Sequence, residues 1–355
     1  MTYSRLGWDE FFSNHYTRLD LPADVTPGRI TGVHKNRFTV STGDLELTAT
    51  AKGTLGRNPE ELIPAVGDWV ALRHNVIIHV LPRKNCLSRG ASGSRHKTSP
   101  LAWKPQIIAA NLDTVFVVCG LDRDYRLSRI ERYLTLVLSC GCSPVVLLTK
   151  ADLHPNPGEL LPEVASVAGA TPVHMISATT GQGLDALEPY LAPGNTVALI
   201  GSSGTGKSTL VNALTGADIK ATQLVSQCVG KGIHTTTSRD MILLRSGAMI
   251  IDNPGLREIA LWEMDGGLDT AFRDITELAM NCRFSDCTHT NEPGCQVLEA
   301  IAAGQLQARR MDSYHKMKQE MDYLIRRRDT GADRLEKERW KAISKKVKQM
   351  KKSRG

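Results

Sequence analysis

A glycine-rich loop of the phosphate-binding type lies near the middle of this 355-residue chain and not near its start. It follows the apolar run 197–200 and precedes a helix-forming stretch, which is the strand–loop–helix context that the pattern GxxxxGK[ST] requires. Glycines let backbone N–H groups turn toward a phosphate, Lys207 reaches the β and γ oxygens, and the Ser208 hydroxyl is a ligand for Mg²⁺. The residues predicted to bind nucleotide phosphates are Gly201, Ser202, Ser203, Gly204, Thr205, Gly206, Lys207, Ser208 and Thr209.

Further nucleotide-binding motifs occur on both sides of this loop, in an unusual order. Before it come the residues typical of guanine recognition, at the ends of two apolar runs: Thr149, Lys150, Asp152, Ser177 and Ala178. After it come a threonine-rich switch segment and a DxxG motif: Thr235, Thr236, Thr237, Asp252 and Gly255. The strands that carry these motifs are therefore ordered 4, 5, 6, 1, 2, 3 of a doubly wound GTPase sheet. Packing and right-handed crossovers fix the neighbours in a sheet, so this order predicts the same α/β sheet, circularly permuted.

The motif order resembles that of the circularly permuted GTPases, and the flanking segments 28–30, 64–70, 81–83 and 109–113 narrow the resemblance. Together with a Cys/His cluster near the C-terminus, they resemble the RsgA family (YjeQ/YloQ) of bacterial GTPases that depend on the small ribosomal subunit. The resemblance extends from about residue 27 to near residue 345. It implies a late assembly factor of the 30S subunit that binds 16S rRNA, hydrolyses GTP when the subunit stimulates it, and then leaves.

Five short runs rich in β-branched residues predict a small β-barrel between residues 27 and 85. The pattern allows an OB or an SH3-like barrel, and the resemblance favours OB. Phe38 and Trp69 are candidates for base stacking, although core packing is the favoured interpretation of each. We expect an N-terminal extension over 1–26, an OB-fold domain over 27–85, a basic linker over 86–105, a permuted GTPase domain over 106–268 and a zinc-binding helical domain with a basic tail over 269–355.

Four potential metal ligands lie close together in the C-terminal region: Cys282, Cys287, His289 and Cys295. Three thiolates and one imidazole form the closed tetrahedral set of structural zinc sites, with no position left for a reactive water. We therefore expect one structural Zn²⁺ per chain. The other cysteines before the phosphate loop show no such grouping and are interpreted as ordinary thiols.

Positive charge is concentrated at the C-terminus. Residues 271–355 carry 19 basic and 12 acidic side chains, whereas residues 1–270 are balanced, and the segment between Asp68 and Asp113 carries seven basic side chains and no acidic one. A solvated charged face is the alternative for either block, but two blocks beside a GTPase favour an RNA phosphate surface. Because the sequence has no long apolar run and no signal-peptide pattern, we expect a cytoplasmic protein without a membrane partner. A monomer is the expected oligomeric state, although no sequence feature selects it.

The motifs predict how GTP is bound. Asp152 accepts from the guanine N1–H and N2–H₂ groups, and the backbone of Ala178 donates to O6, so GTP is preferred over ATP. Lys150 packs over the base. Thr149 replaces the more common asparagine, which weakens but does not remove the expected contact to N7.

The motifs also predict how GTP is hydrolysed. One of the three switch threonines is expected to join Ser208 on Mg²⁺, Asp252 to hold the ion through water, and the Gly255 N–H to touch the γ-phosphate. Leu256 stands where other GTPases place a water-orienting glutamine, so unaided hydrolysis should be slow. His234 is the candidate for positioning the water, and a purely structural role for it is the alternative.

Two other functions remain open at this stage. One is an RNA-binding GTPase that acts on another RNA, such as tRNA. The other is an RNA chaperone in which GTP binding is only regulatory.

Overall fold

The computed structural model describes residues 3–34, 37–53, 55, 62–89, 106–122, 125–216, 239–252, 267–323 and 325–326. The chain divides into two compact units. The first unit comprises Met1–Leu87 and Ile107–Glu258, and the second comprises Ser88–Gln106 and Ile259–Gly355. The first contains a β-barrel and a nucleotide-binding sheet, and the second is helical where it is described after residue 266.

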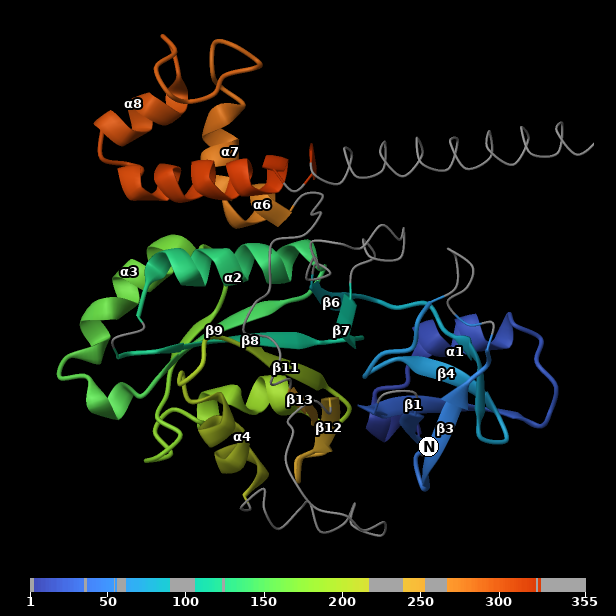
Figure 1. Ribbon diagram of the computed structural model, residues 1–355. Coiled ribbons are helices and arrows are strands. Elements are labelled where there is room, and N and C mark those ends of the chain that lie inside the picture. Colours follow the sequence, from blue (N-terminus) through green and yellow to red (C-terminus); the bar gives the residue numbers. More distant parts are fainter. Residues whose placement is uncertain are drawn as a thin grey trace, which may run out of the picture. The chain divides into compact units, whose positions relative to one another are not determined.

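The first unit is built around eleven strands that form one continuous sheet (Figure 1). They are β1 (Val25–His34), β2 (Arg37–Ser41), β3 (Glu46–Ala51), β4 (Trp69–Arg73), β5 (Val76–Val80), β8 (Thr114–Gly120), β9 (Pro144–Thr149), β10 (Val173–Met175), β11 (Thr196–Ile200), β12 (Arg239–Leu243) and β13 (Met249–Asp252). A separate two-stranded sheet pairs β6 (Cys86–Arg89) with β7 (Gln106–Ala110).

Short and medium helices connect these strands. They are η1 (Tyr3–Leu6), α1 (Glu10–Thr17), α2 (Leu127–Ser139), η3 (Ala151–Leu153), η4 (Pro157–Leu160), α3 (Leu161–Ala168), η5 (Asp185–Leu191) and α4 (Lys207–Thr215).

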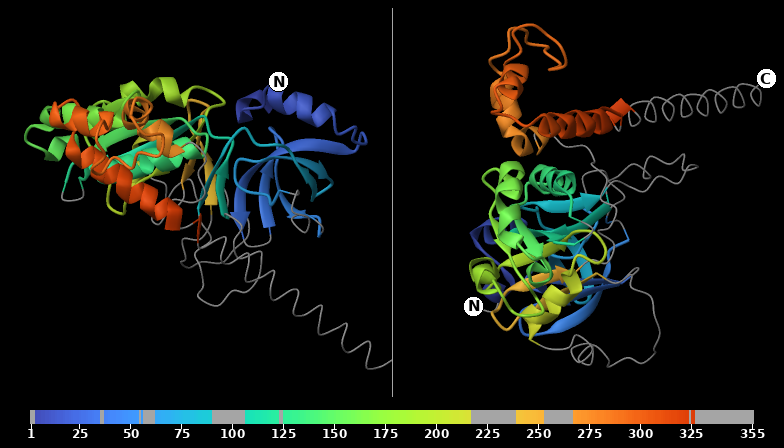
Figure 2. Two further views of the ribbon diagram at one scale, coloured as in Figure 1. Left: turned by 90° about the horizontal axis from the view of Figure 1, so that it is seen from above. Right: turned by 90° about the vertical axis from the view of Figure 1, so that its left-hand side faces the viewer.

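The nucleotide-binding half of the sheet has the strand order β10-β9-β8-β11-β13-β12. All neighbours are parallel except β12, which is antiparallel to β13. In the numbering of an unpermuted GTPase sheet this order is 6-5-4-1-3-2, so the predicted permuted fold is confirmed. Helices α2 and α3 cover one face and α4 covers the other (Figures 1 and 2). Because both faces are covered, β8, β9 and β11 are buried along their whole length, as their unbroken apolar sequences require.

The N-terminal strands close into a barrel. Their pairings run β1–β2–β3–β5–β4 and return from β4 to β1, with only β3 and β5 parallel. Ile30, Val40 and Ile77 are among the fully buried side chains of its core. Phe38 and Trp69 are also buried, at 7% and 0% exposure, so both belong to the protein interior and neither offers a face to a base. A closed five-stranded barrel agrees with the predicted β domain, and its assignment to the OB class stays a prediction.

Strand β1 is shared between the barrel and the nucleotide-binding sheet. Residues 25–29 pair with β4, whereas Gly32 and Val33 pair with Asp240 and Arg239 of β12. An irregularity in register between Ile30 and Gly32 lets the strand bend from one sheet into the other. β12 begins directly after the segment predicted to carry the switch threonines, so the barrel is bonded to the strand that follows that switch.

The N-terminal extension is part of the same core. Asp9 caps α1 by accepting from the backbone N–H groups of Phe11 and Phe12, at 3.0 and 3.4 Å. Helix α1 thereby presents Phe12, which packs in one cluster with Trp69 and with Met249 of β13. Residues 3–17 therefore fill the space between the barrel and the nucleotide-binding sheet.

The second unit contains α6 (Gly267–Ala271), α7 (Arg273–Ala279), α8 (Gln296–Ala302) and a helix over residues 308–323. Arg310 on that last helix joins it to α7: its guanidinium donates to both carboxylate oxygens of Asp274, at 2.9 and 3.0 Å, and lies 4.2 Å above the ring of Phe272. In the part of the chain that the structure describes, no helix is long and apolar enough to cross a membrane.

Candidate nucleotide-binding site and metal centre

The predicted phosphate loop connects β11 to α4, as its sequence context requires. Gly201 has φ +150°, and a Cβ there would lie 2.3 Å from the carbonyl oxygen of Val118, so no larger residue fits. Gly206 precedes the helix with φ +90°. The ammonium of Lys207 donates to the carbonyl oxygens of Gly201 and Ser202, at 2.8 and 2.5 Å, which places it inside the curve of the loop.

The first turn of α4 continues this site. Ser208 and Thr209 are both exposed at the N-terminus of the helix. Backbone N–H groups at such a terminus have no partner within the helix and favour anions. The loop and the helix therefore form a concave group of donors, with the predicted magnesium ligand Ser208 accessible beside it.

The base-reading motifs lie at the carboxyl ends of the neighbouring strands. Thr149 ends β9, and the backbone N–H of Ala151 donates to the carbonyl oxygen of Ile176 at 3.2 Å. This bond joins the TKxD loop to the Ser177–Ala178 loop. Because parallel strands end at the same edge of a sheet, both loops lie at the edge that carries the phosphate loop.

The side chains of these motifs have distinct surroundings. Asp152 is exposed on η3, where its carboxylate is accessible to a base. Ser177 is fully buried and its hydroxyl accepts from the backbone N–H of Thr180 at 3.2 Å, so its side chain shapes the loop that carries the partly buried Ala178.

Thr149 is buried, with 2% exposure, and its hydroxyl faces the phosphate loop. Its Oγ1 lies 2.6 Å from the carbonyl oxygen of Thr205 and 3.3 Å from that of Cys119. The motif predicts a weakened contact of this hydroxyl with the base, whereas in the structure it points toward the phosphate loop.

Lys150 adopts a left-handed backbone conformation, with φ +61°, and forms an ion pair with Asp122 at 2.5 Å. Asp122 follows the end of β8, the strand between β9 and β11. Asp122 is not part of any predicted motif, although its place after a parallel strand is where ligand-contacting residues gather.

The remaining predicted site residues are not placed by this geometry. His234, Thr235, Thr236, Thr237 and Gly255 lie outside the described residues, as do Leu256 and the basic tail from residue 339. The backbone of Asp252 ends β13, beside the phosphate-loop strand β11.

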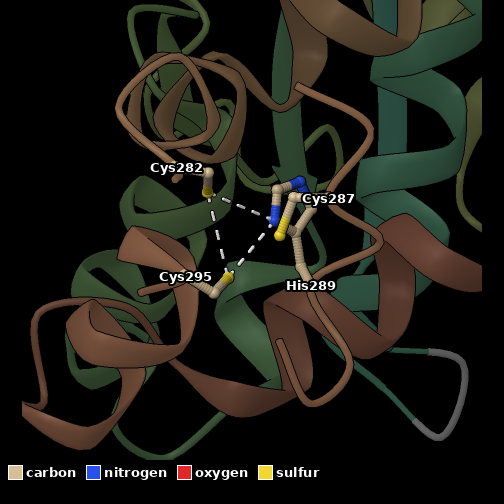
Figure 3. A group of neighbouring side chains, drawn as sticks. All are labelled: Cys282, Cys287, His289 and Cys295. Carbon is tan, nitrogen blue, oxygen red and sulfur yellow. Dashed lines mark hydrogen bonds between the residues drawn. The ribbon is translucent and has the colours of Figure 1, made fainter. Parts of the chain in front are cut away.

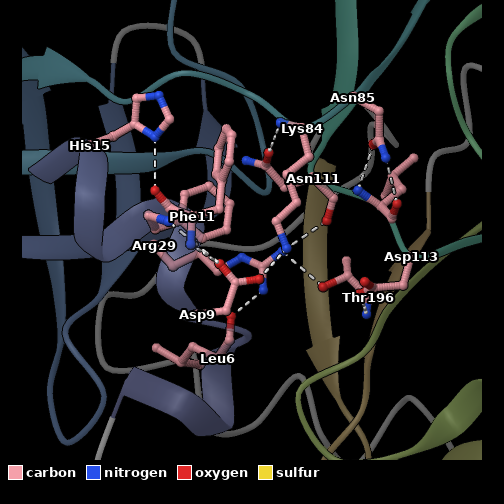
Figure 4. Close-up of polar contacts among 12 residues, drawn as sticks. Leu6, Asp9, Phe11, His15, Arg29, Lys84, Asn85, Asn111, Asp113 and Thr196 are labelled. Atoms are coloured by element: carbon pink, nitrogen blue, oxygen red, sulfur yellow. Dashed lines mark hydrogen bonds and ion pairs between the residues drawn. The ribbon is translucent and has the colours of Figure 1, made fainter.

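A buried arginine connects the barrel to this sheet (Figure 4). Arg29 of β1 is 1% exposed and donates to the hydroxyl of Thr196 at 2.8 Å and to the carbonyl oxygens of Asn111 and Gly67 at 3.2 and 3.4 Å. It also donates to the carbonyl oxygen of Leu6. Burial lowers the pKa of Arg29 to about 10, and nearby acidic side chains partly oppose this shift. Thr196 begins β11, so the barrel contacts the base of the strand that ends in the phosphate loop.

The predicted metal ligands come together in the second unit (Figure 3). The ligand atoms of Cys282, Cys287, His289 and Cys295 all lie within 4.8 Å of one another. The Sγ of Cys282 is 3.9 Å from the Sγ of Cys295 and 3.7 Å from Nδ1 of His289, and that Nδ1 is 3.4 Å from the Sγ of Cys295. A tetrahedral zinc ion with bonds of about 2.3 Å to sulfur and about 2.0 Å to nitrogen requires separations of about 3.8 Å between sulfurs and about 3.5 Å from sulfur to nitrogen. The arrangement therefore fits zinc.

The backbone around the cluster is shaped to hold it. His289 has φ +59°, and Cys295 precedes α8 with its sulfur accepting from the backbone N–H of Leu298 at 3.5 Å. Glu292 accepts from the backbone N–H groups of Thr288 and Thr290, at 2.8 and 2.9 Å. These bonds fix the loop that carries Cys287 and His289. Within the described ranges, no other group of three or more His, Cys, Asp or Glu side chains could hold a metal ion.

The cysteines outside the cluster have different surroundings. Cys142 is buried, and burial raises the pKa of its thiol, as it does for Cys86. Among the described residues, neither belongs to a group of side chains that could hold a metal ion. Their interpretation as ordinary thiols stays a prediction.

The fold and these sites define a circularly permuted P-loop GTPase with a Cys₃His metal centre. Comparisons with known proteins agree. The model of the family described as RsgA GTPase matches residues 80–262, just over half of the chain. A second model, described as a 50S ribosome-binding GTPase, matches residues 196–352.

Named relatives cover nearly the whole chain. A protein of Methanosarcina acetivorans is 44% identical over 92% of this chain and 88% of its own length, and one of Opitutus terrae is 42% identical over 97% and 96%. Each is named a small ribosomal subunit biogenesis GTPase RsgA. The chain belongs to the RsgA GTPase family, and it is a GTPase.

Solved structures show the same fold. YjeQ from Thermotoga maritima aligns with a TM-score of 0.62 and 26% identity, over 84% of this chain and 98% of that one. YloQ, described as a circularly permuted GTPase, aligns with a TM-score of 0.59 and 22% identity, over 84% and 96%.

Proposed function

We propose that this GTPase acts in the late maturation of the small ribosomal subunit, binds its 16S rRNA, and leaves after hydrolysis that the subunit stimulates. The observation that carries the nucleotide part is the junction of the phosphate loop and the TKxD loop through Thr149 and Thr205. The ribosomal part is supported by relatives that are named small ribosomal subunit biogenesis GTPases and align over most of their length.

The guanine base is read by the two loops that follow β9 and β10. Asp152 accepts from N1–H and N2–H₂, and the backbone N–H of Ala178 donates to O6. The exposure of Asp152 and the bond between Ala151 and Ile176, which holds the two loops together, support this assignment. Adenine has an acceptor at N1, a donor at position 6 and no amine at position 2, so the site selects GTP and GDP over ATP.

The phosphates lie against the loop 201–206 and the first turn of α4. The ammonium of Lys207 lies inside the curve of the loop. When a nucleotide binds, it replaces its hydrogen bonds to the carbonyl oxygens of Gly201 and Ser202 with bonds to β- and γ-phosphate oxygens. Ser208 holds Mg²⁺, which neutralises phosphate charge when bound. A threonine among residues 235–237, the carboxylate of Asp252 and the backbone N–H of Gly255 complete the site, and His234 positions the attacking water.

RNA binding is the task of the basic blocks and of the barrel. Residues 271–355 carry the entire net charge of +7, which suits a phosphate backbone. Zinc, one ion per chain, holds the second unit together and leaves no open coordination position for chemistry. The protein acts as a monomer in the cytoplasm.

Co-sedimentation tests this function directly. The protein is mixed with isolated 30S subunits, 50S subunits or tRNA, in the presence of GDP or of a nonhydrolysable GTP analogue. We expect retention on 30S with the analogue and release with GDP. The matched control is Lys207→Met, which removes the phosphate contact and should abolish the difference between the two nucleotides.

Other outcomes identify the alternatives. Retention on 50S would favour the activity that the description of the second family model suggests, and retention on tRNA would favour another RNA substrate. Equal binding to 30S with either nucleotide would indicate a chaperone in which GTP does not control release. Any of these results would overturn the proposal.

A further inference from the structure

Thr149 occupies the position where GTPases of this type usually have an asparagine. Its side chain has one hydroxyl proton, and the neighbouring carbonyl oxygens show where that proton is donated. Its side chain is buried with 2% exposure. The two polar atoms near its Oγ1 are the carbonyl oxygens of Thr205 and Cys119, at 2.6 and 3.3 Å. A carbonyl oxygen only accepts hydrogen bonds, so the hydroxyl must donate to one of them, and the shorter distance selects Thr205.

The guanine N7 atom is also an acceptor. A threonine hydroxyl has one proton, whereas an asparagine amide has two and can serve the phosphate loop and the base together. If Thr149 donated to N7, the carbonyl oxygen of Thr205 would lose its partner next to a buried side chain, at the cost of an unmet hydrogen bond. The geometry therefore leaves no proton of residue 149 for the base.

The bond to Thr205 has a structural role of its own. β9 and β11 are not neighbours in the sheet, because β8 lies between them. The hydrogen bond from the Thr149 hydroxyl to Thr205 passes over the carboxyl end of β8, where Cys119 lies. It joins β9, the strand before the base-reading loop, to the phosphate loop. Thr205 is itself 2% exposed, and its hydroxyl donates to the carbonyl oxygen of Ser202 at 3.0 Å, so the bond reaches a buried, hydrogen-bonded part of the loop.

We propose that this GTPase recognises guanine without a hydrogen bond to N7, and that Thr149 is a positioning residue that fixes the phosphate loop to the base-reading strand. The substrates it accepts therefore include guanine nucleotides whose position 7 cannot accept a hydrogen bond, such as 7-deaza-GTP. This inference rests on the proposed function, because residues 149–152 must be the segment that reads the base.

Competition binding tests the inference. GTP, 7-deaza-GTP and ATP are each titrated against a fluorescent GDP analogue bound to the full-length protein. We expect 7-deaza-GTP to bind the wild type within about threefold of GTP, a smaller loss than that of one neutral hydrogen bond, which is about fivefold. The proposal is overturned if the wild type binds 7-deaza-GTP more than threefold more weakly than GTP.

Variants separate the two roles of the side chain. Thr149→Asn supplies a second proton and should prefer GTP over 7-deaza-GTP by about fivefold. Thr149→Val keeps the shape but loses the tether, so its affinity for GTP and 7-deaza-GTP should fall equally, and Thr149→Ser, which keeps the hydroxyl, should lose less. Thr48→Val, on an exposed position of the barrel strand β3, is the matched control for the change of residue type. If Thr149→Val lost affinity for GTP but not for 7-deaza-GTP, Thr149 would be an N7 ligand and the proposal would be wrong.

Failure of the proposed function has a different signature. A wild-type protein that bound ATP as well as GTP would show that residues 149–152 do not read guanine. Selective binding of GTP over ATP, together with weak binding of 7-deaza-GTP, would retain the GTPase assignment and refute only the role of Thr149.

Discussion

Arg29 in the barrel donates a 2.8 Å hydrogen bond to the hydroxyl of Thr196, the first residue of the strand that leads into the phosphate loop. Arg29 is 1% exposed, and its guanidinium also donates to three backbone carbonyl oxygens and to the sulfur of Met249, which lies at 3.6 Å. The Thr196 backbone N–H in turn donates to Asp113 at 2.7 Å. The contact therefore belongs to a buried polar network, in which Arg29 donates to Thr196 and Thr196 donates to Asp113.

Replacing Arg29 with alanine should destabilise the first unit strongly. The change removes the donor to the carbonyl oxygens of Leu6 and Asn111 and leaves that of Gly67 with the Asn111 amide alone, so we expect the free energy of unfolding to fall by about 3 kcal/mol. Urea unfolding followed by tryptophan fluorescence measures this, because Trp69 lies in the neighbouring core. Arg37→Ala, on an exposed position of β2, is the control. Equal midpoints for the two variants would show that the network contributes nothing to stability.

Asp122→Asn should weaken the binding of GTP and GDP by the same factor. The change removes the counter-ion of Lys150, which is expected to cover the base, and the base is common to both nucleotides. Because the pair is partly exposed, we expect a loss of about two- to fivefold. Nucleotide dissociation constants for this variant and for the exposed control Glu188→Gln provide the measurement. A loss confined to GTP would place Asp122 near the γ-phosphate instead.

Asp152→Asn should shift base preference toward xanthosine nucleotides. The amide donates to the carbonyl group that xanthine carries in place of the guanine N2 amine, whereas the carboxylate accepts from that amine. Competition between GTP and xanthosine triphosphate measures the preference of each protein. Unchanged selectivity for GTP would refute the assignment of residues 149–152 as the base-reading motif.

Purified protein should contain about one zinc ion per chain, and Cys287→Ser should lose it on dialysis. Binding energy at such a site is folding energy, so the second unit should become sensitive to protease while GTP binding by the first unit persists. Metal analysis and limited proteolysis are the measurements. Cys140→Ser, outside the cluster, should retain the metal. Zinc-free protein that had never met a chelator would disprove the site.

Local sequence patterns were sufficient to predict the phosphate loop and the metal cluster, because each depends on residues that are close in the chain. The permuted sheet could be predicted from the order of the motifs that follow its strands. Lys207 and Asp152 could be assigned because each follows the end of an apolar strand. His289 and Cys295 could be assigned to one metal site because they are close in the sequence. The contacts that the sequence did not reveal are long-range. Nothing near Arg29 in the sequence indicates its bond to Thr196, which is 167 residues away. Nor does the identity of Thr149 indicate that its proton is directed to Thr205.

The N-terminal residues were also beyond prediction. Residues 1–26 lay outside the recognised resemblance, yet Leu6 and Phe12 pack against Trp69 and Met249. Their aromatic content was the available signal, since Trp8, Phe11 and Phe12 are too apolar for a solvated tail. These aromatic residues pack where β4, which carries Trp69, approaches β13, which carries Met249. The local sequence pattern does not show that these two distant strands come together.

The division of β1 between two sheets has a consequence for any shortened form of the protein. Gly32 and Val33 cover the outer backbone of β12, whose Leu243 is already 62% exposed. A chain that lacked the barrel would present β12 as an open edge, with free backbone N–H and C=O groups next to apolar side chains. Such edges recruit strands from other molecules and lead to aggregation. The barrel thus keeps the nucleotide-binding sheet from associating with copies of itself, whatever it contributes to binding RNA.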